Sequence, residues 1–164
     1  MDATTSTIYK SYSEWRDHRQ EEFNNLPIYW AFSDDQFNRV CKEQNFTADD
    51  LVQPSWLGGG FCRKTDLDKI KEWASQSDGL SELMSDADFA VDAFYYEMCN
   101  HEYGINYYQG DWDVITCFVQ PEPEYHERYG YKEYLTSTGH EDWIPAYVKA
   151  RQKYFHDAEE NDWF

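Results

Sequence analysis

The sequence predicts an α+β fold that is mainly α-helical, with a small sheet of two or three strands. Apolar residues recur at helical spacing in most segments, and residues typical of helix starts stand before them. Only short runs have the aromatic and β-branched character of strands. A length of 164 residues suits one domain. We therefore predict a single acidic domain over residues 1–164, with residues 1–12 and 157–164 able to fray at its ends.

The first third of the chain predicts helix, strand and helix. Ser13 is expected to cap a helix with the sequence EWRDHRQEEF, which ends before Pro27. The run IYWAF, residues 28–32, is the best candidate for a strand. Ser33 is expected to cap the next helix, DDQFNRVCKEQ, whose two leading acids favour the helix dipole.

The middle of the chain predicts a turn, a second strand and two helices. Residues 51–64 contain a proline turn and three glycines, after which a second short strand is expected. Thr65 is expected to open a helix. Either Ser85 or Asp86 caps the following one, which Gly104 is expected to stop.

The last third predicts further helices. Asp111 is expected to cap a short helix, WDVITCF, although these residues are equally compatible with a strand. A tyrosine-rich helix is expected over residues 125–135, and a long one over 140–160 if Pro145 lies in its first turn. The long helix should bury one face, formed by Ile144, Tyr147, Val148, Arg151, Tyr154 and Phe155.

The apolar residues of this chain are dominated by rings. There are 31 Phe, Trp and Tyr residues against 19 Leu, Ile and Val. We therefore expect a core built mainly from aromatic side chains. Because tyrosine and tryptophan carry polar groups that need partners, some should remain half exposed and suit contacts with another molecule.

The formal charge is −18, from 32 acidic and 14 basic residues spread along the whole chain. Such a field repels nucleic acid and anionic lipid, and it attracts basic proteins. We expect a basic protein partner, no direct nucleic-acid binding and no membrane binding, and a homodimer remains open. The alternative is that the acidity only keeps the protein soluble.

The four cysteines form no Cys-x-x-Cys pair, so a zinc ribbon or a thioredoxin-like site has no support. The N-terminal residues lack a charged-then-apolar leader, and no run approaches membrane-spanning length. These features predict a cytoplasmic protein with reduced thiols.

Glu97 and His101 are candidate metal ligands, because residues four apart share a helix face. Ile105 stands where a zincin would need its second histidine, which excludes that chemistry. A third ligand would come from one of two later pairs, His126-Glu127 or His140-Glu141. The alternative is structural: an imidazolium at a helix C-terminus, paired with Glu97 and needing no cofactor.

Other candidate binding residues are aromatic residues expected at the surface and pairs of adjacent charged residues. Arg63 and Lys64 form the only adjacent basic pair and could hold an anion beside the glycine turn, although a tight structural turn explains the same letters. The full set of candidate binding residues is Trp30, Asp34, Asp35, Arg63, Lys64, Glu141, Asp142, Trp143, Glu159, Glu160 and Trp163.

Three stretches, YWAFSDDQF (29–37), GGGFCRK (58–64) and DADFAVDAFYYEMCNHEY (86–103), resemble an uncharacterised family. That family consists of small acidic proteins from gut-type bacteria and their phages or mobile elements. The resemblance covers roughly residues 28–104 and implies no activity.

Three functions are consistent with the sequence, which names no reaction. The first is an acidic inhibitor, encoded by a phage or mobile element, that mimics nucleic acid on the basic surface of a CRISPR or restriction component. The second is a metal-binding protein or metal-dependent hydrolase centred on Glu97 and His101. The third is an acidic partner protein without mimicry.

Overall fold

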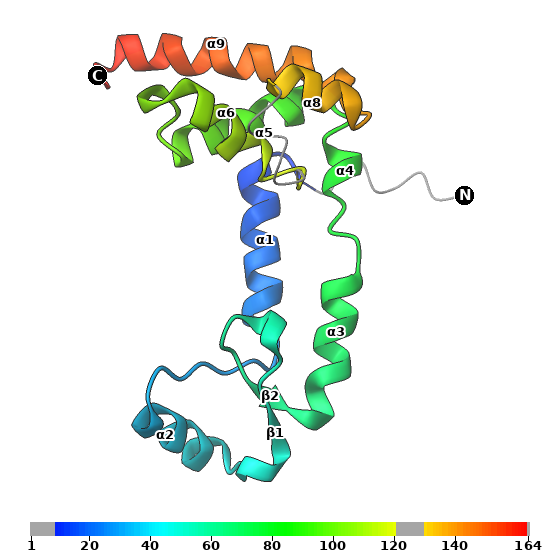
Figure 1. The fold of residues 1–164 in the computed structure, drawn as a ribbon, viewed down its shortest axis with the longest axis vertical. Coiled ribbons are helices and arrows are strands. Elements are labelled where there is room, and N and C mark those ends of the chain that lie inside the picture. Colours follow the sequence, from blue (N-terminus) through cyan, green and yellow to red (C-terminus); the bar gives the residue numbers. More distant parts are fainter. Residues whose placement is uncertain (1–8, 121–129, 164) are drawn as a thin grey trace. The chain divides into compact units, whose positions relative to one another are not determined.

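A computed structural model describes residues 9–120 and 130–163, apart from the side chains of residues 107–108. It confirms the predicted class: the described chain is mainly helical, with one two-stranded antiparallel sheet (Figure 1). Residue contacts divide the chain into two compact units, which leaves the predicted single domain a prediction. Unit 1 comprises Met1–Asp17 and Gly79–Phe164, and unit 2 comprises His18–Asp78.

Helix α1, Tyr12–Asn24, begins in unit 1 and ends in unit 2. The predicted cap, Ser13, is wrong. Ser11 stands one residue before the helix, and its Oγ accepts a hydrogen bond from the backbone N of Glu14 at 3.1 Å. Starting the helix one residue before Ser13 places Tyr12 and Trp15 on the buried face.

Unit 2 has a small core that includes residues of its short sheet. Its buried residues are Leu57, Cys62 and Ile70, against which Ile28, Val52 and Leu67 pack. Besides the end of α1, its elements are α2 (Asp34–Gln44), η1 (Ala48–Asp50), β1 (Leu51–Val52), η2 (Ser55–Leu57), β2 (Cys62–Arg63), η3 (Lys64–Asp66) and α3 (Leu67–Ser75).

The second predicted strand is confirmed as β2, which pairs with β1 in the register Leu51↔Arg63. The first predicted strand, residues 28–32, is wrong: only Tyr29 forms a bridge, with Phe61. Their backbones exchange hydrogen bonds of 2.8 and 2.9 Å. The chain next to Phe61 comes so close that a Cβ on Gly60 would lie 3.0 Å from Cγ2 of Ile28, which explains a glycine there.

The two caps predicted from serine and aspartate residues ahead of acidic first turns are confirmed. Ser33 caps α2 by accepting a hydrogen bond from the backbone N of Gln36 at 3.2 Å. Asp86, rather than Ser85, caps α5 and accepts from the backbone N of Phe89 at 2.8 Å. The helix predicted from Thr65 begins instead as the turn η3 and becomes α-helical at Leu67.

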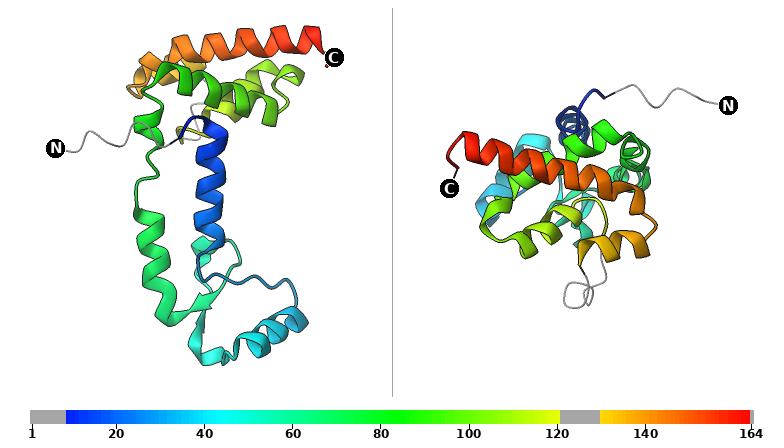
Figure 2. Two further views of the ribbon diagram at one scale, coloured as in Figure 1. Left: turned by 180° about the vertical axis from the view of Figure 1, so that it is seen from behind. Right: turned by 90° about the horizontal axis from the view of Figure 1, so that it is seen from above.

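In the described part of unit 1 every regular element is a helix, and α9 lies along α5 (Figure 2). Its elements are the start of α1, α4 (Leu80–Leu83), α5 (Ala87–Asn100), η4 (Tyr103–Ile105), α6 (Tyr107–Ile115), α8 (Tyr131–Ser137), η5 (Glu141–Trp143) and α9 (Ile144–Glu160). The predicted aromatic core is here. Among the described residues its buried branched aliphatic side chains are Val114, Ile115 and Leu135, against eleven rings: Tyr12, Trp15, Phe89, Phe94, Tyr103, Trp112, Tyr131, Tyr134, Trp143, Tyr147 and Tyr154.

The predicted stop at Gly104 is wrong. Helix α5 ends at Asn100, and Glu102 takes the left-handed conformation with φ 49°, which glycine usually supplies. Gly104 has a different use: its backbone N donates a hydrogen bond to the Tyr154 hydroxyl at 3.2 Å. The corner after α5 is thereby tied to α9.

The segment predicted as a short helix or a strand is helical, but Asp111 is not its cap. Helix α6 begins earlier, with Asn106 as its cap. Asp111 lies within the helix, where its Oδ1 accepts hydrogen bonds of 2.6 Å from the hydroxyls of Tyr103 and Tyr147. Tyrosine hydroxyls buried in the core need such an acceptor.

The two last predicted helices are present where the structure describes them. Residues 125–129 of the tyrosine-rich segment lie outside the described residues, and the rest forms α8. Pro145 lies in the first turn of α9, as predicted. Tyr147 and Tyr154 are buried on α9 as expected, while its other buried residues are alanines that the predicted face omits: Ala146, Ala150 and Ala158.

None of the helices in the described part of the chain is both long and apolar enough to cross a bilayer.

Candidate metal centre

Glu97 is the one charged side chain that is fully buried in the described part of the chain, with an exposed fraction of 0%. It lies in the last turn of α5, inside unit 1. A buried carboxylate is costly unless other groups compensate its charge. Its partners therefore define the site.

Each carboxylate oxygen of Glu97 has its own set of partners. Oε1 accepts a hydrogen bond of 2.7 Å from the Tyr12 hydroxyl and forms an ion pair with Arg16. Oε2 accepts from Nδ2 of Asn100 at 3.1 Å and lies 3.4 Å from Nε2 of His101. Oε1 is thus held by α1, and Oε2 faces the end of α5.

These partners keep Glu97 ionised. Burial by itself would raise its pKa, but the hydrogen bonds from Tyr12 and Asn100 and the charge of Arg16 outweigh burial and lower the pKa below its usual value. Burial, and then the hydrogen bond to Glu97, raises the pKa of Tyr12, so that its hydroxyl keeps the proton that it donates.

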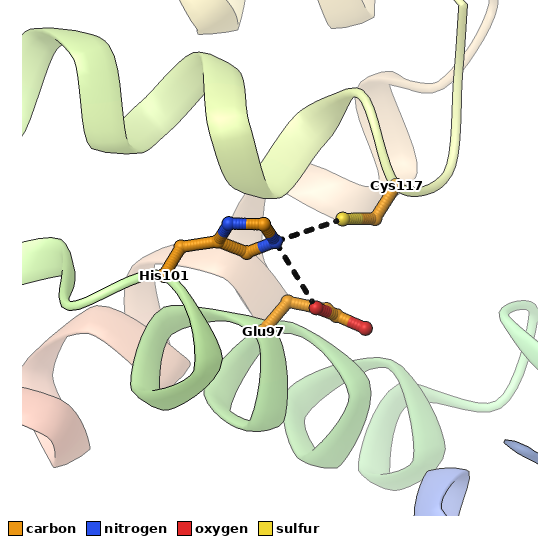
Figure 3. Close-up of side chains that lie close together, drawn as sticks. All are labelled: Glu97, His101 and Cys117. Atoms are coloured by element: carbon orange, nitrogen blue, oxygen red, sulfur yellow. Dashed lines mark hydrogen bonds and ion pairs between the residues drawn. The ribbon is translucent and has the colours of Figure 1, made fainter. Parts of the chain in front are cut away.

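His101 and Cys117 complete the cluster. Nε2 of His101 lies 3.4 Å from Sγ of Cys117, which follows α6 (Figure 3). The donor atoms of Glu97, His101 and Cys117 all lie within 4.8 Å of one another. The imidazole nitrogen stands between the carboxylate and the thiol, so three ligand types converge on one point.

Without a bound metal ion, the thiol of Cys117 keeps its proton. Cys117 is exposed at the surface, but partial desolvation at the cluster, followed by the negative charge of Glu97, raises the pKa of its thiol to about 12. Such a thiol is a poor nucleophile at neutral pH. A bound metal ion would remove its proton, because a coordinating thiol is deprotonated.

The spacing of the donors fits a tetrahedral ion. Zinc lies about 2.0–2.1 Å from nitrogen or oxygen and about 2.3 Å from sulfur, which puts neighbouring donors about 3.3–3.6 Å apart. The His101–Glu97 and His101–Cys117 separations are both 3.4 Å. Two of the distances between donor atoms thus match those expected around a tetrahedral zinc ion.

The predicted meeting of Glu97 and His101 is confirmed, but the third member is one that sequence reasoning missed. Of the candidates for that position, His126 and Glu127 lie outside the described residues, and His140 stacks on Trp143 with ring centroids 4.0 Å apart. Cys117 gives no local signal, since it lies 16 residues from His101. The packing of α6 against α5 is what brings it close.

The predicted binding residues of unit 2 fall into two groups. Trp30 is 40% exposed, and Asp34 and Asp35 are exposed in the first turn of α2. The two basic residues already have protein partners: Arg63 pairs with Asp66 at 2.8 Å, and Lys64 donates to the backbone O of Asp49 at 2.6 Å. An incoming anion would compete with both contacts.

The predicted binding residues of unit 1 are exposed, with one exception. Trp143 is 6% exposed and packs edge-on against Phe94 at 6.1 Å, so it is a core residue. Trp163 is 44% exposed beside Tyr154. The acidic members of the set are all on the surface: Glu141, Asp142, Glu159 and Glu160.

Comparison with known proteins gives one match. The model of a family described as "Family of unknown function (DUF7659)" matches residues 11–112. No curated protein and no solved structure matches. The matched segment contains Glu97 and His101, together with Tyr12 and Arg16, and it ends before Cys117.

Proposed function

This chain belongs to the DUF7659 family of unknown function, and we propose from the residues of its own site that it binds a divalent transition metal. The ligands are Glu97, His101 and Cys117, and zinc is the metal that suits them best. Thiolate and imidazole favour zinc, whereas magnesium and calcium take oxygen ligands.

One observation carries the proposal: a carboxylate, an imidazole and a thiol converge with donor separations of 3.4 Å around His101. The contacts to the other oxygen of Glu97 support it. Tyr12 and Arg16 occupy Oε1, while Oε2, which also accepts from Asn100, is directed at the cluster. Hydrogen bonds of this kind orient metal-ligating carboxylates in proteins.

Three protein ligands leave one tetrahedral position for water or a substrate, which is the arrangement of catalytic rather than structural zinc sites. Arg16 is paired with the same carboxylate and its side chain is 41% exposed, so its guanidinium would be available to an anionic group bound at the ion. A metal-dependent hydrolase is therefore the enzyme class that the site would serve.

Metal analysis of protein purified without chelator, followed by metal titration of the protein after its metal has been stripped, tests the proposal. Isothermal titration with Zn²⁺, and Co²⁺ absorption with its thiolate charge-transfer band, should show one site. C117S should abolish the charge-transfer band, and H101A should weaken zinc binding by about 100-fold or more.

The chain offers matched controls for both variants. His156 also faces a glutamate four residues away, Glu160, at 3.5 Å, and Cys99 is an exposed thiol on the same helix as Glu97. H156A and C99S should leave zinc affinity unchanged. Equal loss in the controls, or full zinc binding by C117S, would reject the centre.

A second function, the acidic interaction protein, is supported by where the charge lies. Unit 1 has 21 acidic and 7 basic residues, a formal charge of −14, whereas unit 2 has 11 and 7, a charge of −4. A concentrated negative field suits a basic, nucleic-acid-binding surface of a host or defence protein, such as a CRISPR or restriction component. The phage or mobile-element origin and the cytoplasmic location belong to this proposal.

Salt dependence tests this second function. Binding to a basic DNA-binding domain should weaken steeply as ionic strength rises, because the screening length shortens from about 30 Å at 0.01 M to about 3 Å at 1 M. Duplex DNA should compete for the same domain. An affinity that changes neither with ionic strength nor with added DNA would contradict the proposal that the protein mimics nucleic acid.

A further inference from the structure

An open groove lies in unit 1, at the C-terminal ends of α5 and α9. Its volume is about 730 Å³, within the range of binding pockets. None of the metal-centre residues lines it. The residues around it are Tyr95, Cys99, Glu102, Ile105, Tyr154 and Trp163.

Two large apolar side chains stand on the surface at this groove. Ile105 is 77% exposed and Trp163 is 44% exposed. Ile105 ends the turn η4, and Trp163 follows α9, so the two come from segments far apart in sequence. Exposed apolar side chains gathered at one groove are typical of an interaction site.

The apolar wall is held in place before anything binds. The Trp163 ring packs edge-on against Tyr154 at 5.5 Å, and its backbone N donates to Ala158 O at 3.1 Å. The Tyr154 hydroxyl in turn accepts from the backbone N of Gly104 at 3.2 Å. A preformed wall of this kind lowers the entropy lost on binding.

The charge at the groove is negative. In the described part of the chain the carboxylate of Glu102 forms no hydrogen bond or ion pair, and its backbone is held at φ 49°. Asp162 and Glu159 are exposed nearby in sequence to Trp163. The neighbouring cation, Lys153, is already paired with Asp157.

We propose that this groove docks a protein segment in which an apolar side chain is flanked by lysine or arginine. The inference deepens the second function above, the acidic interaction protein, and rests on it. The apolar side chain would lie between Ile105 and Trp163, and the cation would meet Glu102. The charge of −14 on unit 1 repels the anionic alternatives, a nucleic acid or a lipid surface.

The probe is a fluorescein-labelled peptide of alternating lysine and leucine. Two matched peptides replace all lysines by glutamate or all leucines by serine. Fluorescence anisotropy should show that only the lysine–leucine peptide binds well, with each replacement weakening binding about tenfold or more.

Variants of the groove then locate the binding. W163A and I105S should each weaken the peptide about tenfold, and E102Q about threefold. Controls of the same residue type lie elsewhere: W56A changes a tryptophan that is 51% exposed in unit 2, and E82Q an exposed glutamate on α4. Neither control should change the affinity.

The outcomes separate the groove from the wider function. Charge-dependent binding that the groove variants leave intact would overturn the groove and preserve the acidic interaction protein. Binding insensitive to charge and salt would overturn both. Self-association that W163A abolishes, without peptide binding, would make a second copy of this chain the occupant and overturn the proposal.

Discussion

Unit 1 and unit 2 differ in how their side chains are used. In the part of unit 1 that the structure describes, the core contains eleven buried rings and one buried carboxylate, whereas the core of unit 2 has three buried residues. Unit 2 instead leaves rings on its surface, with Phe32 86% exposed and Trp56 51% exposed. Because burial of apolar surface is the main source of stability, unit 1 should be the stable part of the molecule.

The difference bears on function as well. The Glu97 cluster and the groove at Trp163 both lie in unit 1, where a dense core can hold donor atoms and rings in fixed positions. Unit 2 has a two-stranded sheet with two residues in each strand, which is weak support on its own. A chemical site is therefore better placed in unit 1.

The largest expected effect comes from the ring at the centre of the unit 1 core. Phe94 is 0% exposed and contacts Phe118, Trp143 and Tyr147 edge-on. F94A should lower the free energy of unfolding by about 3–5 kcal/mol, because it removes these contacts and leaves a cavity. Denaturant titration measures the loss.

The matched change on the surface of unit 2 is F32A, which should stay within about 0.5 kcal/mol. Native-state amide exchange should also show α3 opening at lower free energy than α5. Equal protection of α3 and α5 against amide exchange would contradict the inference that unit 1 is more stable than unit 2.

The next effect concerns the buried carboxylate. E97A should cost about 2–4 kcal/mol, because Tyr12 loses its acceptor and Arg16 its counter-ion; the partial exposure of Arg16 limits the loss. Thermal unfolding of the metal-free protein measures this cost.

The pH dependence of E97Q gives an independent test. The folded-state pKa of Glu97 is lowered from the ordinary value of 4.5, so its stabilising contribution is full above that pH and is lost as the pH falls through the lowered value. Wild-type stability should fall more steeply than that of E97Q below about pH 4.5. Parallel profiles would show that Glu97 contributes nothing through its charge.

A smaller effect compares the helix caps of the two units. S11A, at the start of α1, and S33A, at the start of α2, should each cost about 1 kcal/mol, since each removes the acceptor for a backbone N–H. S13A is the control, because Ser13 lies inside α1. A larger loss for S13A than for S11A would place the start of the helix elsewhere.

The smallest expected effect is a gain. Glu102 adopts φ 49°, a conformation that glycine reaches at little cost. E102G should raise the melting temperature by an amount corresponding to about 0.5–1 kcal/mol. It should also weaken the lysine–leucine peptide at the groove; E102Q separates the two effects because it keeps the backbone strain.

Much of the fold could be predicted because its signals are local. Ser33 and Asp86 were identifiable as caps, since a short polar side chain before an acidic first turn satisfies the same backbone donors in any context. The predictions failed where a distant partner decides. Residues 28–32 are of types that favour strands, but only Tyr29 finds a bridging partner. Asp111 lies inside α6, where it accepts hydrogen bonds from two tyrosines of other segments.

The same division applies to the candidate centre. A spacing of four residues was enough to bring Glu97 and His101 together, because that spacing puts both on one helix face. Cys117 and Arg16 could not be assigned from spacing, since Arg16 lies on α1 and Cys117 lies in the turn after α6.

By itself the sequence determined the helical class, the aromatic core and the strong negative charge, because each follows from residue type and short-range periodicity. Only the tertiary structure decided which carboxylate is buried, which thiol meets the imidazole and which rings remain on the surface. Those outcomes depend on how α1, α5, α6 and α9 pack in unit 1, and packing is set by contacts between residues far apart in the chain.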